Sequence, residues 1–367
     1  MKVKLTEICT PKQWKTIPTN ALLEDGYPVY GANGIIGYYD EYNHEEPVIA
    51  ITCRGATCGT INLTVPKAYI TGNAMCLDNV CADVLPDYLY YCLLHYNFNN
   101  IISGSAQPQI TRQGLAKVEI ELHPIIEQGK IINSLRKSKA IINARQNQLQ
   151  KLDDLVKARF VELFGDMFLN SKAWEERPLD LLAEVVSGIT KGRKTKEPQL
   201  TEVPYMAVSN VKDGYIDWTT VKTIQATQQE IEQYRLLPDD VLMTEGGDPD
   251  KLGRGAILKE PLENCIHQNH IFRVRLNESL ILPTFFAEYL KHQKAKRYFL
   301  GCAKQTTGIA SINMRQLKAL PVLLPPLELQ VQFASFVKQV DKSKVAVQKS
   351  LDEAQLLFDS LMQQYFG

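Results

Sequence analysis

Two segments of the chain combine glycine with cationic side chains, a combination that suits contact with phosphate groups. The first is the basic run 191–196, and the second is the segment 244–254, in which two glycines precede Lys251 and Arg254. Glycine lets a backbone approach a ligand closely, while lysine and arginine neutralise phosphate charge. A solvated loop without a ligand explains the basic run equally well.

Other polar segments have side chains that can read the edges of bases. Residues 267–270, His-Gln-Asn-His, offer donors and acceptors that suit adenine or guanine. The first half of the chain has counterparts at 54–57 and 71–73, and the order of the segments aligns Asn73 with Asn269. For any one of these residues, a role in shaping its loop is at least as good an explanation.

Two polar loops, 103–109 and 304–308, each lead to a residue that can cap a short helix, Thr111 or Asn313. The N-terminus of such a helix can face a phosphate group. Together with Asn210, which the repeat aligns with Asn33, these segments and the short helices give the candidate DNA contacts, which are Arg54, Thr57, Asn73, Gln107, Gln109, Arg112, Lys191, Arg193, Lys194, Lys196, Asn210, Lys251, Arg254, His267, Gln268, Asn269, Lys304, Gln305 and Arg315.

Residue patterns of several known catalytic sites are absent from the sequence. No lysine has Asp or Glu two positions before it, as a PD-(D/E)xK nuclease requires, and the Pro-Pro pair at 325–326 lacks the neighbours of an amino-methyltransferase corner. The sequence also lacks a phosphate-binding G-x4-GK[ST] loop, an HExxH motif and a G-x-S-x-G elbow. We therefore expect no catalytic residue in this chain.

The cysteines give no strong metal signal. Cys53 and Cys58 are five apart, as are Cys76 and Cys81, whereas zinc pairs are usually separated by about two to four residues. The surrounding segments resemble strands, so we expect reduced thiols and no metal site.

Composition limits how the chain can bind a charged partner. Lys+Arg and Asp+Glu are 41 each, which gives a net charge of zero, so any DNA binding must come from local basic patches. We find no N-terminal apolar run and no stretch of about 18 apolar residues. These features favour a cytoplasmic protein without a membrane segment.

The chain contains a second version of itself. A shift of 202 residues brings residues 110–115 onto 312–317, and this register then holds without a gap to Gly367. Elsewhere the matches keep their order while the shift drifts. A long internal repeat indicates one functional unit used twice.

Both copies end in a predicted long helix whose apolar residues alternate in steps of four and three, the seam of a coiled coil. Nine of ten seam positions from Phe333 to Tyr365 are apolar, as are seven of the ten equivalents from Ile131 to Leu163. We expect the two seams to pair in antiparallel fashion, although each helix could instead pack only on its own globular unit. The expected pairing residues are Leu135, Ile142, Leu149, Val156, Leu163, Val337, Val340, Val347, Leu351, Phe358 and Leu361.

The predicted fold class is α+β, with two mixed α/β domains related by a pseudo-twofold repeat and separated by the two long helices. The expected boundaries are 1–124 for the first domain, 125–170 for the first helix and a hinge, 171–325 for the second domain and 326–367 for the second helix.

In this arrangement the chain resembles the specificity (S) subunits of type I restriction–modification enzymes. The residues that carry the resemblance are the doubled architecture, Gln-Pro-Gln-Ile at 107–110, the repeated Ile-x4-Leu, the segment 323–330 at the head of the second helix, and the glycines that follow Arg54 and Glu245. The combination in this order is specific, and it covers essentially the whole chain. Residues 122–128 depart from the pattern seen at 323–330.

The resemblance implies a non-catalytic subunit whose two target recognition domains each read one half of a split DNA sequence. It also implies two methyltransferase (M) subunits docked on the paired helices, and restriction (R) subunits in the complete complex. No cofactor is expected in this subunit, while S-adenosylmethionine, ATP and Mg²⁺ are expected in the partners. The alternatives are a stand-alone bipartite DNA-binding regulator and a scaffold that binds only proteins.

Overall fold

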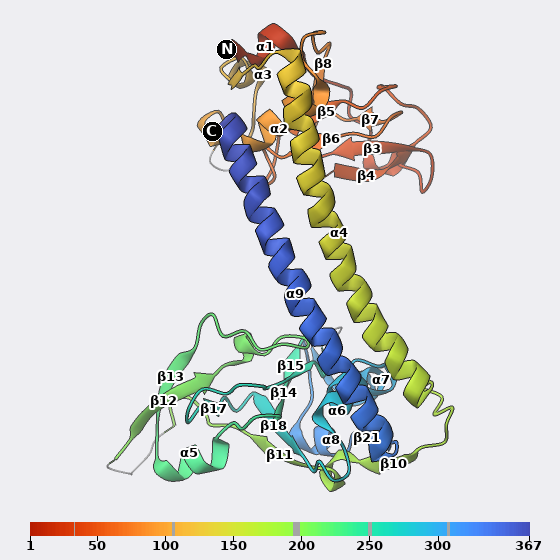
Figure 1. The fold of residues 1–367 in the computed structure, drawn as a ribbon, viewed down its shortest axis with the longest axis vertical. Coiled ribbons are helices and arrows are strands. Elements are labelled where there is room, and N and C mark those ends of the chain that lie inside the picture. The colour runs from red at the N-terminus through yellow and green to blue at the C-terminus, as the bar shows by residue number, and fades with distance from the viewer. Residues whose placement is uncertain (33, 105–106, 194–198, 249–251, 307–308) are drawn as a thin grey trace. The chain divides into compact units, whose positions relative to one another are not determined.

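The chain divides into two compact units. The computed structural model describes residues 1–32, 34–104, 107–193, 199–248, 252–306 and 309–367. The first unit comprises Met1–Gln148 and Val347–Gly367, and the second unit is Leu149–Ala346. Each unit takes part of both long helices (Figure 1), because the helix ends are built into the globular cores.

The described residues of the first unit form three small sheets. Their strands are β1 (Lys2–Lys4), β2 (Thr10–Gln13), β3 (Tyr27–Gly31), β4 (Gly34–Tyr39), β5 (Ile49–Thr52), β6 (Ile61–Leu63), β7 (Tyr69–Ile70), β8 (Ala74–Asp78) and β9 (Glu119–Glu121). The sheets have the orders β2-β8-β5-β6, β4-β3-β7 and β1-β9, and β7 runs parallel to β3. The helices are α1 (Leu5–Ile8), α2 (Pro86–His95) and α3 (Arg112–Leu115), with short 3₁₀ turns at Thr19–Ala21 and Phe98–Asn100.

The second unit repeats this topology. Its strands are β10 (Glu175–Pro178), β11 (Ala183–Ser187), β12 (Thr201–Met206), β13 (Lys222–Ala226), β14 (Val241–Thr244), β15 (Gly246–Gly247), β16 (Gly255–Ile257), β17 (Ile266–His267), β18 (Ile271–Leu276), β19 (Lys304–Thr306), β20 (Ile309–Ser311) and β21 (Pro321–Leu324). The orders β11-β18-β14-β16, β13-β12-β17 and β10-β21 match those of the first unit strand by strand. The second unit also contains a three-stranded sheet of order β15-β20-β19.

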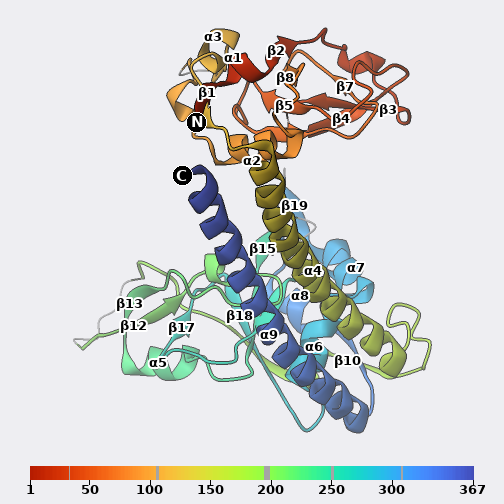
Figure 2. The same cartoon turned by 45° about the horizontal axis from the view of Figure 1, so that its top comes forward.

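The helices of the second unit extend this correspondence in part, since the helix at Gln228–Tyr234 has no counterpart among the described helices of the first unit. They are α5 (Gln228–Tyr234), α6 (Pro283–Tyr289), α7 (Gln293–Cys302) and α8 (Met314–Lys318), with 3₁₀ turns at Leu179–Leu181 and Val208–Asn210. Figure 2 gives a second view of α5 with β12, β13 and β17. Helix α6 corresponds to α2, and each has proline in its first turn, where a missing N–H costs no helical hydrogen bond.

Strand register corrects one part of the sequence alignment. Tyr30 of β3 pairs with Ile70 of β7, and Met206 of β12 pairs with His267 of β17. His267 is therefore equivalent to Ile70, and Asn73 is equivalent to His270 rather than to Asn269. The sequence alignment was wrong by one residue because a short strand with few shared residue types does not fix its own register.

The two long helices predicted from the seams are present as α4 (Ile125–Phe164) and α9 (Leu327–Phe366), each of 40 residues. From Arg136 to Leu155, every seam position of α4 is buried or half-buried and every other position is exposed. No helix in the described parts of the chain is long and apolar enough to span a membrane.

Within each unit α4 and α9 contact each other, and the residue numbers of the contacting pairs change in opposite directions along the two helices. In the first unit, Ser138 Oγ donates to the carbonyl oxygen of Ala354 at 3.5 Å and Arg145 Nε donates to Ser350 Oγ at 3.1 Å. In the second unit, Asp153 pairs with Lys344, and Phe160 contacts Phe333 with ring centroids 5.3 Å apart. In each unit the residue number on α9 falls as the number on α4 rises.

A buried glutamine holds the first turn of each long helix on its own unit. Gln128 Oε1 accepts from the Leu85 N–H at 2.9 Å, and its Nε2 donates to the carbonyls of Asp83 and His123. Gln330 makes the equivalent bonds, with the Leu282 N–H at 2.8 Å and the carbonyls of Leu280 and Pro325. Both side chains are fully buried, so these bonds are shielded from water.

The last turn of each long helix packs on the aromatic helix of the unit where it ends. Phe164 of α4 contacts Phe285 of α6 at 4.8 Å between ring centroids, within the second unit. Phe366 of α9 contacts Tyr88 of α2 at 5.5 Å, within the first unit. Each globular core is therefore completed by the end of a helix that begins in the other half of the chain.

Candidate nucleic-acid interface

Three neighbouring chain segments form an exposed rim in the first unit. Arg54, just after β5, forms a backbone bridge with Gln109, and Gln109 forms a second bridge with Ser103. The N–H of Gly55 donates to the carbonyl oxygen of Pro108 at 3.1 Å, which fixes the loop after β5 against the segment before α3. The side chains of Arg54, Gln109 and Ser103 are all exposed, so this row, the first rim, is open to a ligand.

The second unit has an equivalent row. Gly246 of β15 pairs with Ser311 of β20, and Ser311 pairs in turn with Lys304 of β19. Gly246 occupies the position of Arg54, Ser311 that of Gln109, and Lys304 that of Ser103. This row, the second rim, therefore has its cation at the opposite end from that of the first rim.

A third loop joins each rim through the same pair of backbone hydrogen bonds. In the first unit, the Cys53 N–H donates to the Asn73 carbonyl and the Ile110 N–H donates to the Cys53 carbonyl, both at 3.0 Å. In the second unit, Glu245 takes the place of Cys53 and bonds to His270 and Ile312 at 3.0 and 2.9 Å. These bonds bring Asn73 beside the first rim and His270 beside the second.

The sequence placed His270 in a base-reading segment, but it aligned Asn269 rather than His270 with Asn73. The His270 side chain is 55% exposed, and its Nδ1 hydrogen-bonds to the Glu245 carboxylate. The signal that would have identified it is the parallel pairing of β12 with β17, which single-residue matches do not reveal.

The residues expected to cap the short helices do so. Thr111 Oγ1 accepts from the Gly114 N–H at 3.1 Å, and Asn313 Oδ1 accepts from the Gln316 N–H at 3.0 Å. The caps fix the first turns of α3 and α8, on which Arg112 and Arg315 are exposed. Gln107 and Lys191 are also exposed.

Two candidate contacts are buried, so we no longer propose them as DNA contacts. Asn210 is 3% exposed, and its side chain bonds to the backbone of Ala207, Asp217 and Thr220. His267 is fully buried, its Nδ1 lies 3.0 Å from the Ile271 carbonyl, and burial lowers its pKa to about 3. A neutral histidine buried at this position is a core residue and is not accessible to a ligand.

Other candidates have internal partners in the structure. Arg193 pairs with Glu230, a residue of the capping box of α5, and also donates to the Gln225 carbonyl. The Arg193 guanidinium lowers the pKa of Glu230 by hydrogen bonding to its carboxylate. Thr57 Oγ1 donates to the Ala32 carbonyl at 3.1 Å, which shapes the loop that follows Arg54.

Two more polar candidates lie beside the second rim. Gln268 Oε1 accepts from the Val208 N–H at 3.4 Å, and the Asn269 side chain lies 3.4 Å from the His270 ring. Both residues are half-buried. Lys194, Lys196 and Lys251 lie outside the described residues, as does the side chain of Gln305.

Arg254 lies in a small cationic cleft that the sequence did not predict. Lys296 and Lys291, the latter paired with Glu288 at 2.8 Å, line the same cleft, as does Asp213. The Arg254 Nε is buried without a hydrogen-bond partner. Cations gathered around a concave surface suit a phosphate group, so Arg254 remains a candidate contact and the two lysines join it.

Comparison with known proteins identifies the family. The family model described as "Type I restriction modification DNA specificity domain" matches residues 1–152 and 171–354. The MjaX specificity subunit assigned in Methanocaldococcus jannaschii is 28% identical over 194 residues, which cover 53% of this chain and 45% of that protein. The EcoKI specificity subunit of Escherichia coli K12 is 22% identical over 287 residues, covering 74% and 61%.

A solved structure has the same fold. The S subunit of a type I restriction–modification system from M. genitalium superposes with a TM-score of 0.63 at 17% identity, covering 100% of this chain and 96% of that one. The matched regions span 45% and 61% of the two curated relatives. Because the family model matches most of the chain, in two segments that follow the internal repeat, the chain belongs to the family of type I restriction–modification specificity subunits.

Proposed function

We propose that this chain is the non-catalytic DNA-recognition subunit of a type I restriction–modification complex, and that each unit reads one half of a split, asymmetric target. The observation that carries the proposal is the pair of rims, which share a backbone framework but present different side chains. A common framework with different exposed groups is what reading two different half-sites requires, because base contacts rather than phosphate contacts give specificity.

Methylation mapping tests this proposal directly. The segment 174–323 is replaced by the matching unit of another specificity subunit, and the complex with its methyltransferase partner is expressed in cells. One half of the methylated sequence is expected to change while the other half and the gap stay the same. A change in both halves would contradict independent reading by the two units.

We further propose that α4 and α9 pair as an antiparallel coiled coil that sets the distance between the half-sites. The buried seam of α4 supports this pairing, as do the contacts in which the residue number on α9 falls while that on α4 rises. Each helix of 40 residues is about 60 Å long at 1.5 Å per residue. Half-sites on one face of B-DNA lie about 34–36 Å apart, so helices of this length are sufficient.

Shortening both helices at the same level tests whether the helix pair sets the distance between the half-sites. Arg145 faces Ser350, so deleting 142–148 together with 347–353 removes one heptad from each helix in a single layer. The deletion shortens the pair by roughly 10 Å, and the unspecified gap in the methylated target is expected to shrink by about three base pairs. Gln146→Ala, at an exposed position of the same layer, is the length-preserving control. An unchanged gap in the shortened protein would contradict the proposal that the helix pair sets the distance between the half-sites.

Two methyltransferase subunits are the proposed partners of the helices. Leu155 and Leu357 occupy equivalent positions in the repeat, and they are 47% and 52% exposed. An exposed leucine at the same place in both copies is a feature that two identical partners can share. Leu155→Glu and Leu357→Glu are each expected to lower the number of co-purifying M subunits from two to one. Gln355→Ala, on the exposed surface of α9, is the control.

The catalytic chemistry belongs, in this proposal, to the partner subunits. The M subunits would bind S-adenosylmethionine and methylate DNA, and R subunits would use ATP and Mg²⁺ for cleavage. This chain would contribute no cofactor of its own to either reaction. Since the target is chromosomal and incoming DNA, we propose that the complex acts in the cytoplasm.

A further inference from the structure

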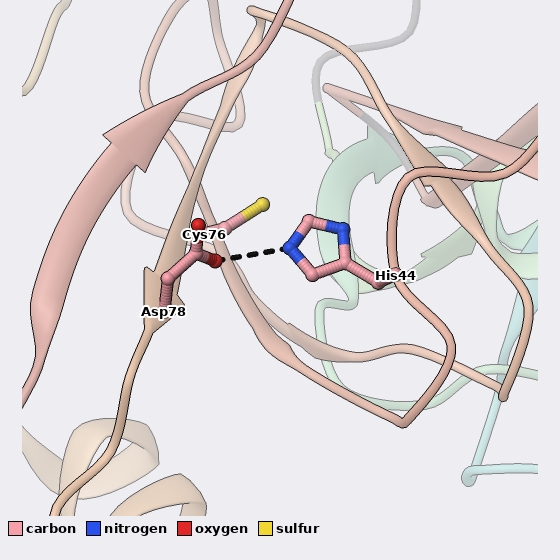
Figure 3. A group of neighbouring side chains, drawn as sticks. All are labelled: His44, Cys76 and Asp78. Carbon is pink, nitrogen blue, oxygen red and sulfur yellow. Dashed lines mark hydrogen bonds and ion pairs between the residues drawn. The ribbon is translucent and has the colours of Figure 1, made fainter.

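Three potential metal ligands meet in the first unit, away from the rim. Cys76 and Asp78 are two residues apart on β8, which places them on the same face of that strand. His44 lies in the segment before β5, where its backbone forms two hydrogen bonds of 3.1 Å with Ala68. Figure 3 shows the three side chains pointing toward one another, and their ligand atoms all lie within 4.8 Å of each other.

The hydrogen bonds around His44 fix which ring nitrogen carries a proton. Asn43 Oδ1 accepts from the Ile70 N–H at 2.9 Å while its Nδ2 donates to the Ile70 carbonyl at 3.0 Å, so the orientation of the amide is set by β7. His44 Nδ1 lies 2.7 Å from Asn43 Oδ1 and must therefore be the donor.

The other nitrogen of His44 then faces an acceptor. In the neutral ring, Nε2 has a lone pair, yet it lies 2.9 Å from Asp78 Oδ1. Two acceptors at this distance repel unless a proton or a cation lies between them. A metal ion bound between the two groups, or a proton on either of them, removes this repulsion.

We propose that His44 Nε2, Cys76 Sγ and Asp78 Oδ1 bind a divalent transition-metal ion of the zinc type. One nitrogen, one thiolate and one carboxylate form a ligand set that suits zinc better than magnesium or calcium, which prefer oxygen. The bond from His44 Nδ1 to Asn43 orients the ring, as is usual for metal-bound histidines. Small side-chain shifts bring atoms within 4.8 Å to the spacing of ligands about 2.0–2.3 Å from one ion.

The surroundings leave room for a fourth ligand. His44 and Asp78 line a cleft of about 420 Å³, whose walls also include Glu45, Glu46 and Trp14. Glu45 is paired with Lys67 at 3.7 Å, so Glu46 is the glutamate whose negative charge favours a cation here. Lys12 Nζ lies over the Trp14 ring at 3.5 Å. A water molecule can complete a tetrahedral site.

Cobalt binding tests the site in the purified full-length chain. Co²⁺ bound to a thiolate gives a charge-transfer band in the near ultraviolet, which reports sulfur coordination directly. The unmodified chain is expected to show this band with one equivalent of Co²⁺, and Zn²⁺ is expected to abolish it by competition. Cys76→Ser is expected to remove the band and to weaken Zn²⁺ binding at least about 100-fold, because a direct ligand is lost.

Matched variants separate metal binding from folding. Cys92→Ser changes another buried cysteine of the first unit and is expected to keep the band. Asp78→Asn retains the size of the side chain and is expected to weaken binding while the protein stays folded. Zn²⁺ is expected to raise the Tm of the unmodified chain and of Cys92→Ser, but not that of Cys76→Ser.

Two results would overturn the proposal. One is the absence of a thiolate band and of any Zn²⁺-dependent rise in Tm in the folded, unmodified chain. The other is an equal band in Cys76→Ser, which would place the metal on different cysteines. In either case His44 and Asp78 form a hydrogen-bonded pair, and Cys76 is a core residue whose thiol pKa is raised by burial.

Discussion

The first rim presents Arg54, Gln109 and Ser103, whereas the second presents Gly246, Ser311 and Lys304. Beneath the rims the two units are alike, with matching strand orders, a buried glutamine at the helix start and a capped turn before the last strand. The difference teaches that the framework tolerates exchange at exposed positions but holds its buried polar contacts fixed. A buried donor or acceptor that loses its partner costs more than an exposed residue that changes type.

The largest loss of stability is expected when an aromatic side chain in the last turn of α4 or α9 is removed from the core on which it packs. Phe164 is fully buried and contacts three other phenylalanines, whereas Phe366 is half-buried. Phe164→Ala is expected to lower the free energy of unfolding of the second unit by about 4 kcal/mol, and Phe366→Ala that of the first unit by about 2 kcal/mol. Denaturant-induced unfolding, monitored by the susceptibility of each unit to proteolysis, measures both losses of stability. Equal losses in the two variants would contradict the difference in burial.

The glutamine contacts are expected to be equivalent in the two units. Gln128→Leu and Gln330→Leu each leave one backbone N–H and two carbonyls without their partner. Each substitution is expected to cost about 3 kcal/mol, since unpaired buried groups dominate the loss. Denaturant unfolding is the measurement, with the exposed Gln146→Leu as control. A loss in only one unit would show that the repeat is not energetically symmetric.

Acid is expected to destabilise the second unit more than the first, because His267 replaces Ile70. Its folded pKa of about 3 lies below the ordinary value of 6.5, so the unfolded chain binds the proton more readily. The stabilising contribution is complete above pH 6.5 and is lost as the pH falls from 6.5 toward 3. The expected loss between pH 7 and pH 5 is about 2 kcal/mol. His267→Ile, which copies the first unit, should flatten this part of the stability profile; an unchanged profile would contradict the assignment.

The cations of the rims are expected to give the smallest effect. Arg54→Ala and Lys304→Ala should each weaken DNA binding by about 1 kcal/mol and reduce the salt slope by about 1 if they contact phosphate. If either residue reads a base instead, the preference at one half-site changes and the slope stays the same. Binding of the assembled complex across salt concentrations separates these outcomes, and Lys342→Ala on α9 is the control. No change from either rim variant would contradict the interface.

The sequence predicted the elements that repeat with strong periodicity. The seams of α4 and α9 were visible because apolar residues recur along forty residues, and the caps Thr111 and Asn313 were visible because the register there has no gap.

The site was less predictable, because its members come from segments far apart in the chain. Asn210 and His267 are polar types that the fold buries, and the sequence does not distinguish them from exposed ones. His270 was misaligned by one residue because the pairing of β17 with β12 fixes its place, and Lys291 and Lys296 were missed because only the fold brings them into the cleft beside Arg254. The His44–Cys76–Asp78 group was likewise invisible, since its spacing follows no linear zinc motif.

The way α9 ends has a consequence for synthesis of the protein. Met362 belongs to the buried core of the first unit, and Phe358, Leu361 and Phe366 pack against that core. These residues follow the whole of the second unit in the chain, although the rest of the first unit precedes it. During synthesis the first unit therefore cannot complete its interior until the second unit has been made, and deleting residues 358–367 should destabilise the first unit before the second.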